Sequence, residues 1–131
     1  MNLALKRILL RKVPGKNRFD GILESGSYNG SGEKQADPAF IRTANATGVL
    51  ALQDYALSFD GSLTETYLFY FDANNSFISY EPKYGITSLT TFTTPANCAY
   101  VRWNCISPTM INTFFQLELG TVATGKEPYR G

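Results

Sequence analysis

Three polar side chains that could recognise a ligand alternate along one predicted strand, residues 99–104. Tyr100, Arg102 and Asn104 share one face of this strand, because successive side chains of a strand point to opposite sides. On a concave sheet face, a phenol, a guanidinium and an amide can donate hydrogen bonds to sugar hydroxyls or to an anionic group. These three residues are therefore the candidate carbohydrate-binding residues.

Two neighbouring residues leave alternatives open. Glu118 is an equally good cross-strand partner for Arg102, because alternation places it on the face away from Phe115. Such an exposed pair would contribute only about 0 to 1 kcal/mol. Trp103 could stack on a sugar ring, but it lies in phase with Val101. We therefore predict that Trp103 belongs to the core.

The sequence contains few of the residue combinations that catalyse reactions. It contains no histidine, which excludes Ser-His-Asp and Cys-His systems and histidine-ligated metals. The eleven acidic residues lie mostly beside turn formers, as in Asp20-Gly21 and Asp60-Gly61, where turn hydrogen bonding or solvation explains them. Two carboxylates can hydrolyse a glycosidic bond, but no pair can be chosen without a fold. We expect that the protein is not an enzyme.

The two cysteines flank the same predicted strand. Extended backbone rises about 3.3 Å per residue, so Cys98 and Cys105 lie roughly 23 Å apart, far beyond disulfide reach. We predict that both are free thiols, which suits assembly in a reducing cytoplasm.

Length and composition predict one all-β domain. A chain of 131 residues can bury a single core, and nine Phe, eight Tyr and eleven Gly favour strands joined by tight turns. Residues 54–61 read as a strand that ends in a turn at Asp60-Gly61, and the Gly/Ser-rich residues 25–32 as a long surface loop. Seven or eight such strands favour a jelly-roll β-sandwich of two antiparallel sheets over residues 17–131.

One predicted strand, residues 66–71, is apolar on both faces. Tyr67, Phe69 and Phe71 alternate with residues that are also mostly large and apolar. In a sandwich the second face must be covered by a loop, a neighbouring subunit or a ligand. We favour a subunit contact and hence a homo-oligomer.

The amino terminus is a basic arm before an acidic domain. Residues 1–18 hold six of the twelve basic residues and no acid, whereas the rest carries six basic residues against eleven acids. Lysine and arginine interrupt its apolar residues, so we predict neither membrane insertion nor a secretory signal. A net charge of +1 argues against nucleic-acid binding. A solvated terminus and an arm, residues 1–16, that docks in an acidic groove of a partner are equally good interpretations. The candidate docking residues are Lys6, Arg7, Leu9, Arg11 and Lys12.

Two sequence segments near the carboxyl terminus resemble those of a known family. Residues 91–103, TFTTPANCAYVRW, precede residues 114–129, FFQLELGTVATGKEPY, at the distance of neighbouring strands. With residues 17–20 and 70–79, they resemble the jelly-roll modules of bacteriophage tail and baseplate proteins, which look like carbohydrate-binding modules. The resemblance spans most of residues 17–129.

The resemblance implies a virion structural protein, assembled in the cytoplasm of the host bacterium. In this interpretation the arm attaches to other virion proteins, and the sandwich adheres to host-surface polysaccharide from a tail fibre, baseplate or head fibre. The alternative is a purely structural capsid decoration or spacer protein that makes only protein contacts. A cellular carbohydrate-binding module is a weaker third interpretation, since we find no linker or secretory signal.

No cofactor is expected. Some carbohydrate-binding jelly rolls hold a structural calcium, for which Asp72, Asn74 and Asn75 could supply oxygens. The simpler interpretation of these three residues is a turn.

Overall fold

The computed structural model describes residues 16–106 and 113–129, which form strands and connecting turns, with no helix in either range. The sheet order is β1-β4-β8-β6-β7 in a seven-stranded antiparallel sheet, in which β5 also pairs with β8 and β9 with β6. A separate two-stranded sheet joins β2 to β3. The strands are β1 (Leu23–Ser25), β2 (Ser27–Tyr28), β3 (Lys34–Gln35), β4 (Phe40–Thr43), β5 (Thr47–Gly48), β6 (Asp54–Phe71), β7 (Phe77–Thr93), β8 (Tyr100–Ile106) and β9 (Phe115–Leu119).

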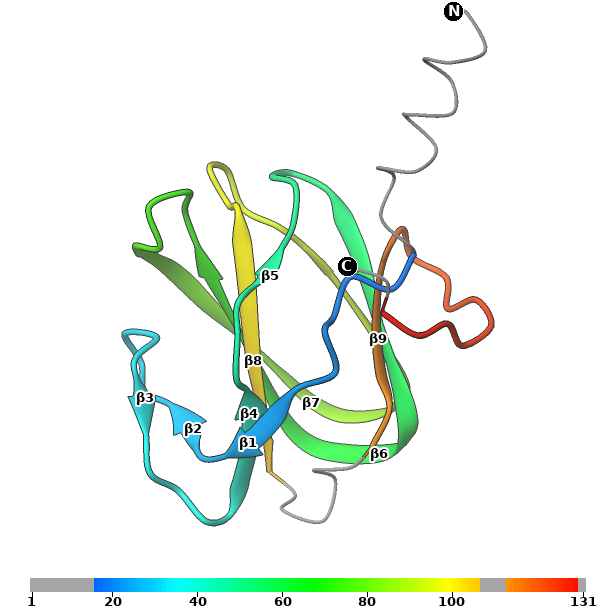
Figure 1. The fold of residues 1–131 in the computed structure, drawn as a ribbon, viewed down its shortest axis with the longest axis horizontal. Coiled ribbons are helices and arrows are strands. Elements are labelled where there is room, and N and C mark those ends of the chain that lie inside the picture. The colour runs from blue at the N-terminus through cyan, green and yellow to red at the C-terminus, as the bar shows by residue number, and fades with distance from the viewer. Residues whose placement is uncertain (1–15, 107–112, 130–131) are drawn as a thin grey trace, which may run out of the picture.

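The large sheet curls on itself to form two packed layers. β6 and β7 have 18 and 17 residues and remain paired along most of their length, while β9 pairs with the first part of β6 and β8 with its last part. Figure 1 shows β6 and β7 sweeping together round the lower part of the view, from the side of β9 to the side of β8. The prediction of an all-β antiparallel sandwich is confirmed, and its two layers are joined through β6 and β7.

A bulge in β6 lets the sheet curl. The register of β6 against β7 shifts between Ser58 and Ser62, and Gly61 there has a φ of 108°. Three residues of β6 stand there against one of β7; such extra residues on one strand bend it and increase its twist, and glycine adopts a positive φ without steric cost. The prediction that the strand ends at Asp60-Gly61 is therefore wrong, because the chain bends there but stays in the sheet.

The core between the layers is aromatic. Trp103 is fully buried, with its ring centroid 4.7 Å from that of Phe19 and 6.3 Å from that of Phe115. Phe19 precedes β1, so a segment outside the sheet supplies part of this core. The prediction that Trp103 is core is confirmed. Both cysteines are also buried free thiols, as predicted.

The second face of β6 is covered by the protein's own chain. Phe69 and Phe71 are buried against Tyr28 of β2, and these three residues form the outer aromatic cluster. The Gly/Ser-rich stretch thus folds into β2 and its turn instead of an open loop. The segment that contains β2, rather than the favoured subunit contact, buries Phe69 and Phe71, and a homo-oligomer stays a prediction.

The segment after β9 is tied back by buried polar side chains. Glu118 accepts hydrogen bonds from the backbone nitrogen and the hydroxyl of Thr124 at 3.2 and 2.7 Å, and from Gln116 at 2.8 Å. Gln116 Oε1 accepts from the backbone nitrogen of Glu127 at 2.7 Å. The carboxyl-terminal segment that carries part of the family resemblance, residues 114–129, therefore has a structural explanation.

Across the described ranges, no helix is long and apolar enough to cross a membrane.

Candidate functional site

The three predicted binding residues share the outer face of β8, which is turned away from the core. The register of β8 against β6 sets each of them opposite an aromatic residue. From Tyr100 through Arg102 to Asn104, the opposing residues are Phe71, Phe69 and Tyr67. Tyr80 of β7 continues the row beyond Phe69. Alternation along the three strands β8, β6 and β7 therefore gathers aromatic and polar side chains on one face.

A pocket of about 240 Å³, here called the outer pocket, lies between this face and the β2–β3 sheet. Its lining combines aromatic rings with uncharged polar groups and one carboxylate. The aromatic members are Tyr28, Phe40, Tyr67, Phe69 and Tyr80. The polar members are Ser27, Asn29, Gln35, Asp37 and Asn104.

The aromatic rings of the pocket touch one another. The Tyr80 ring centroid lies 5.9 Å from that of Phe69 and 6.4 Å from that of Tyr67. Tyr80 is 49 % exposed, whereas Phe69 beside it is buried. A large, partly exposed ring held by its neighbours offers a flat apolar surface at little conformational cost. This surface can receive the C–H face of a sugar ring.

The hydroxyl of Tyr67 already makes a hydrogen bond within the protein. It donates to Glu65 Oε1, and this hydrogen bond, together with burial, raises the pKa of Tyr67 above its ordinary value. Tyr67 therefore stays a neutral phenol at physiological pH and offers the pocket its ring.

Among the residues that line the outer pocket, Asn104 has a buried polar atom without a hydrogen-bond partner. It is 1 % exposed, and its Oδ1 has no hydrogen-bond partner in the described part of the chain. A buried acceptor left unpaired costs about 1 to 3 kcal/mol, so native structures rarely keep one without a reason. Because Asn104 lines the outer pocket, a bound hydroxyl group could supply the missing donor.

The β2–β3 wall of the pocket is held in place before any ligand arrives. The Tyr28 hydroxyl donates to the backbone oxygen of Thr43 at 2.5 Å. Arg42 donates to the backbone oxygens of Ser27 and Gln35 at 3.2 and 2.8 Å. A site whose walls are already fixed loses less entropy when it binds.

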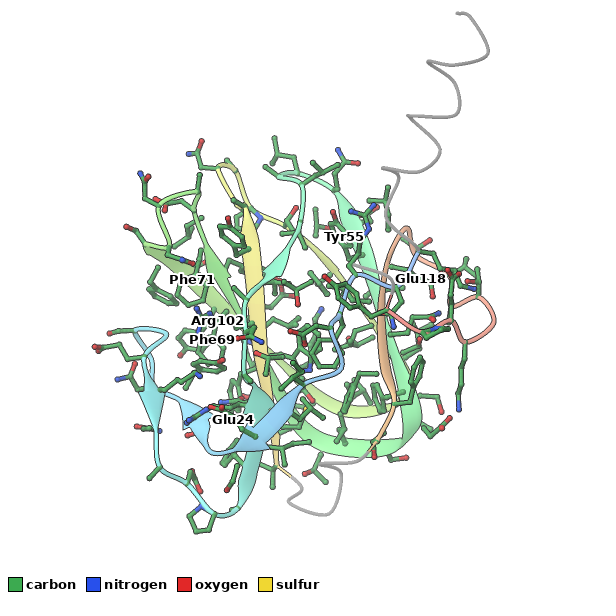
Figure 2. The ribbon with its side chains drawn as sticks, in the orientation of Figure 1. Glu24, Tyr55, Phe69, Phe71, Arg102 and Glu118 are labelled. Carbon is green, nitrogen blue, oxygen red and sulfur yellow. The ribbon has the colours of Figure 1, made fainter. Side chains whose placement is uncertain are left out.

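Arg102 and Tyr100 lie next to the pocket but do not line it. The Arg102 guanidinium carbon is 5.9 Å from the ring centroid of Tyr28 and 5.3 Å from that of Phe71. Figure 2 shows Arg102 gathered with Phe69 and Phe71 on the side of β8 nearer β2 and β3. Tyr100 packs against the outer aromatic cluster. Of the three predicted residues, only Asn104 lines the pocket; Arg102 and Tyr100 support its surroundings.

The alternative pair of Arg102 with Glu118 is not formed. Glu118 lies on β9, which pairs with the first part of β6, and Figure 2 places it on the far side of the molecule from Arg102. Burial by itself raises the pKa of Glu118, but the hydrogen bonds from Thr124 and Gln116 and the charge of Lys16 outweigh it. The net result is a lowered pKa and a carboxylate that is ionised near neutral pH.

The suggested calcium ligands form a turn. Asp72 Oδ1 accepts hydrogen bonds from the backbone nitrogens of Asn74 and Ser76, both at 2.9 Å, and Asn75 has a positive φ of 62°. These contacts explain Asp72 and Asn74 without a cation. Over residues 16–106 and 113–129, no group of three or more His, Cys, Asp or Glu side chains is placed to hold a metal ion.

The predicted docking residues Lys6, Arg7, Leu9, Arg11 and Lys12 lie outside the described residues. The described structure begins at Lys16, whose ammonium donates to the Thr124 hydroxyl at 2.6 Å.

Sequence reasoning missed most of the pocket lining. Tyr80 was visible only as part of a hairpin strand, and Asp37 and Gln35 come from a segment with no recognisable pattern. The available signal for the pocket was that residues 66–71 are apolar on both faces. Such a strand needs another segment packed on its second face, and a pocket can form at the edge of that contact.

No protein-family model matches the chain, and no curated protein matches it. The resemblance to phage modules therefore stays a prediction.

Proposed function

We propose that the protein is a non-enzymatic glycan-binding module of a bacteriophage particle, and that its outer pocket adheres to host-surface carbohydrate. The observation that carries the proposal is the unpaired, buried Asn104 oxygen in a pocket walled by aromatic rings. Sugars present hydroxyl donors at their edges and apolar C–H faces, so they match both features. The resemblance of residues 17–129 to phage tail modules supplies the virion context.

The proposal keeps the arm, residues 1–16, as the attachment to other virion proteins. In this arrangement the sandwich faces outward from the particle, which the host bacterium assembles in its cytoplasm. A homo-oligomer would present several pockets at once, and multivalent contact strengthens weak single-site binding.

The alternative role, a decoration or spacer protein, has one structural observation in its favour. β7 lies at the end of the sheet order, so one edge of this 17-residue strand has no partner in the described structure. Tyr84 on β7 is 62 % exposed. Unpaired strand edges with apolar side chains are common contact surfaces between proteins. A spacer would bury this edge between subunits.

The test is binding of the full-length protein to a glycan array and to whole bacterial cells. Two substitutions in the pocket, Tyr80→Ala and Asn104→Ala, are compared with Tyr129→Ala, which removes a tyrosine of similar exposure (46 %) outside the outer pocket. We expect saturable binding that falls at least tenfold in both pocket variants and is unchanged in the control.

Each variant is first checked for folding by its thermal midpoint. Absence of glycan binding by the folded wild-type protein would reject adhesion and favour the structural role. Equal binding by wild type and both folded pocket variants would place the glycan elsewhere on the protein.

A further inference from the structure

We propose that the outer pocket selects a neutral, hydroxyl-rich sugar residue and rejects acidic sugars, with Asp37 as the residue that sets this selectivity. The inference rests on the proposed glycan binding and narrows its ligand class. The sequence alone left a neutral and an anionic ligand equally open, because Arg102 was expected to face the ligand.

The first observation is the charge of the lining. Of the described residues that line the pocket, Asp37 alone carries a formal charge, and it is negative. A second carboxylate, Glu65, lies beside the pocket through its hydrogen bond with Tyr67. A carboxylate, sulfate or phosphate on a ligand would therefore meet like charge within a partly desolvated site, where such repulsion is strongest.

The second observation is that the neighbouring cations stay outside the pocket lining. Arg42 pairs with Glu24 at 2.5 Å and donates to two backbone oxygens of the β2–β3 wall. Lys34 also pairs with Glu24, at 3.1 Å, and donates to the backbone oxygen of Ala44. The guanidinium of Arg102 lies against the rings of Tyr28 and Phe71, and its buried Nε has no hydrogen-bond partner among the described residues. None of these cations lines the pocket.

The third observation is the kind of hydrogen-bonding group that the pocket leaves open. The unpaired Asn104 atom is an acceptor. Gln35 directs its amide nitrogen to Ser27 Oγ at 2.9 Å, and Asp37 Oδ1 accepts from the backbone nitrogen of Ala39 at 3.1 Å, which leaves Asp37 Oδ2 without a hydrogen bond to the described residues. These acceptor oxygens favour a ligand that donates. Neutral sugar hydroxyls can donate, whereas an ionised acidic group offers only acceptors.

The test compares matched sugar pairs that differ in one charge. The immobilised probes are glucose with glucuronic acid, and galactose with galacturonic acid, each as a short oligosaccharide of the same linkage. The full-length wild-type protein is measured beside Asp37→Asn, whose amide oxygen can keep the turn hydrogen bond to Ala39. Glu33→Gln is the control, because it removes an exposed acid from the same β2–β3 turn without changing the pocket lining.

We expect the wild-type protein to bind the neutral member at least tenfold more tightly than its acidic partner. Asp37→Asn is expected to narrow that ratio severalfold, both by improving acidic binding and by removing one acceptor for a hydroxyl of the neutral sugar, while Glu33→Gln leaves the ratio as in wild type. Tighter binding of the acidic members, or an unchanged ratio in folded Asp37→Asn, would overturn this selectivity and leave glycan adhesion standing. Binding of no glycan at all would overturn the adhesion proposal itself, and the selectivity with it.

Discussion

Replacing Glu118 by glutamine tests whether residues 114–129 have a structural role, in which buried hydrogen bonds hold the carboxyl-terminal segment against the sheet. Glu118 is 3 % exposed and accepts three hydrogen bonds. Its Oε2 accepts from Gln116 and from the backbone nitrogen of Thr124, and its Oε1 accepts from the Thr124 hydroxyl. Glutamine can keep all three contacts if its amide nitrogen takes the Oε1 position and donates to that hydroxyl, which can turn to accept.

The substitution therefore removes charge more than it removes contacts. Hydrogen bonds to a charged group contribute about 1.5 to 3 kcal/mol and neutral ones about 0.5 to 1.5. Glutamine also avoids the cost of burying a charge, which reduces the net loss to about 0.5 to 1 kcal/mol for each of the three bonds and lowers the free energy of unfolding by about 1.5 to 3 kcal/mol. At about 4 °C per kcal/mol for a domain of this size, the thermal midpoint falls by about 6 to 12 °C.

The pH dependence gives a second, independent readout. The pKa of Glu118 is lowered in the folded protein, so its contribution to stability is present above the pKa of the unfolded chain and is lost as pH falls through the folded pKa. We expect the difference between wild type and Glu118→Gln to be constant near neutral pH and to shrink below about pH 4.5, near the unfolded pKa of glutamate.

The assay is urea unfolding at pH 7 and at several acid values, with the glycan array as a control for function. Glutamine at position 118 is expected to leave the affinity for glycan unchanged, because Glu118 lies outside the outer pocket. Equal free energies of unfolding for the two proteins at pH 7, or a difference that does not change with acid, would refute the role given to this carboxylate.

Two further predictions follow from the packing. Gly32→Ala is expected to lower the free energy of unfolding by about 1 to 3 kcal/mol, because Gly32 has a φ of 77° and an added Cβ would lie 2.8 Å from ring atoms of Phe71 and Phe77. Gly30→Ala, in the same turn with open space around it, serves as the matched control and is expected to change stability by less than about 0.5 kcal/mol. Equal destabilisation by both, in urea unfolding, would mean that the β2–β3 turn is not packed as described. Cys105 is expected to react with a thiol reagent at pH 8 only as fast as the protein unfolds, because burial raises its pKa to about 12 and shields the sulfur. Rapid labelling of folded protein, followed by mass spectrometry, would contradict its place in the core.

Much of the fold could be predicted because short-range patterns report on sheet structure. Alternation placed Val101 and Trp103 in the core and Asn104 on the opposite face, since the side-chain period of a strand is fixed by its backbone. The bend at Gly61 was read as a turn, because an Asp-Gly pair fits a hairpin as well as a bulge. Only pairing with β7 on both sides of the bend distinguishes the two.

The sequence by itself determined the class of fold, the state of the cysteines and the two apolar faces of residues 66–71. Those features depend on composition and on neighbours in the chain. Tertiary structure alone decided what covers the second face, because Tyr28 reaches Phe69 only when β2 folds back across the sheet. It also decided that Arg102 turns to aromatic rings and that Asp37 joins Asn104 in one pocket. These residues lie far apart in sequence, and only the curl and register of the sheet bring them together.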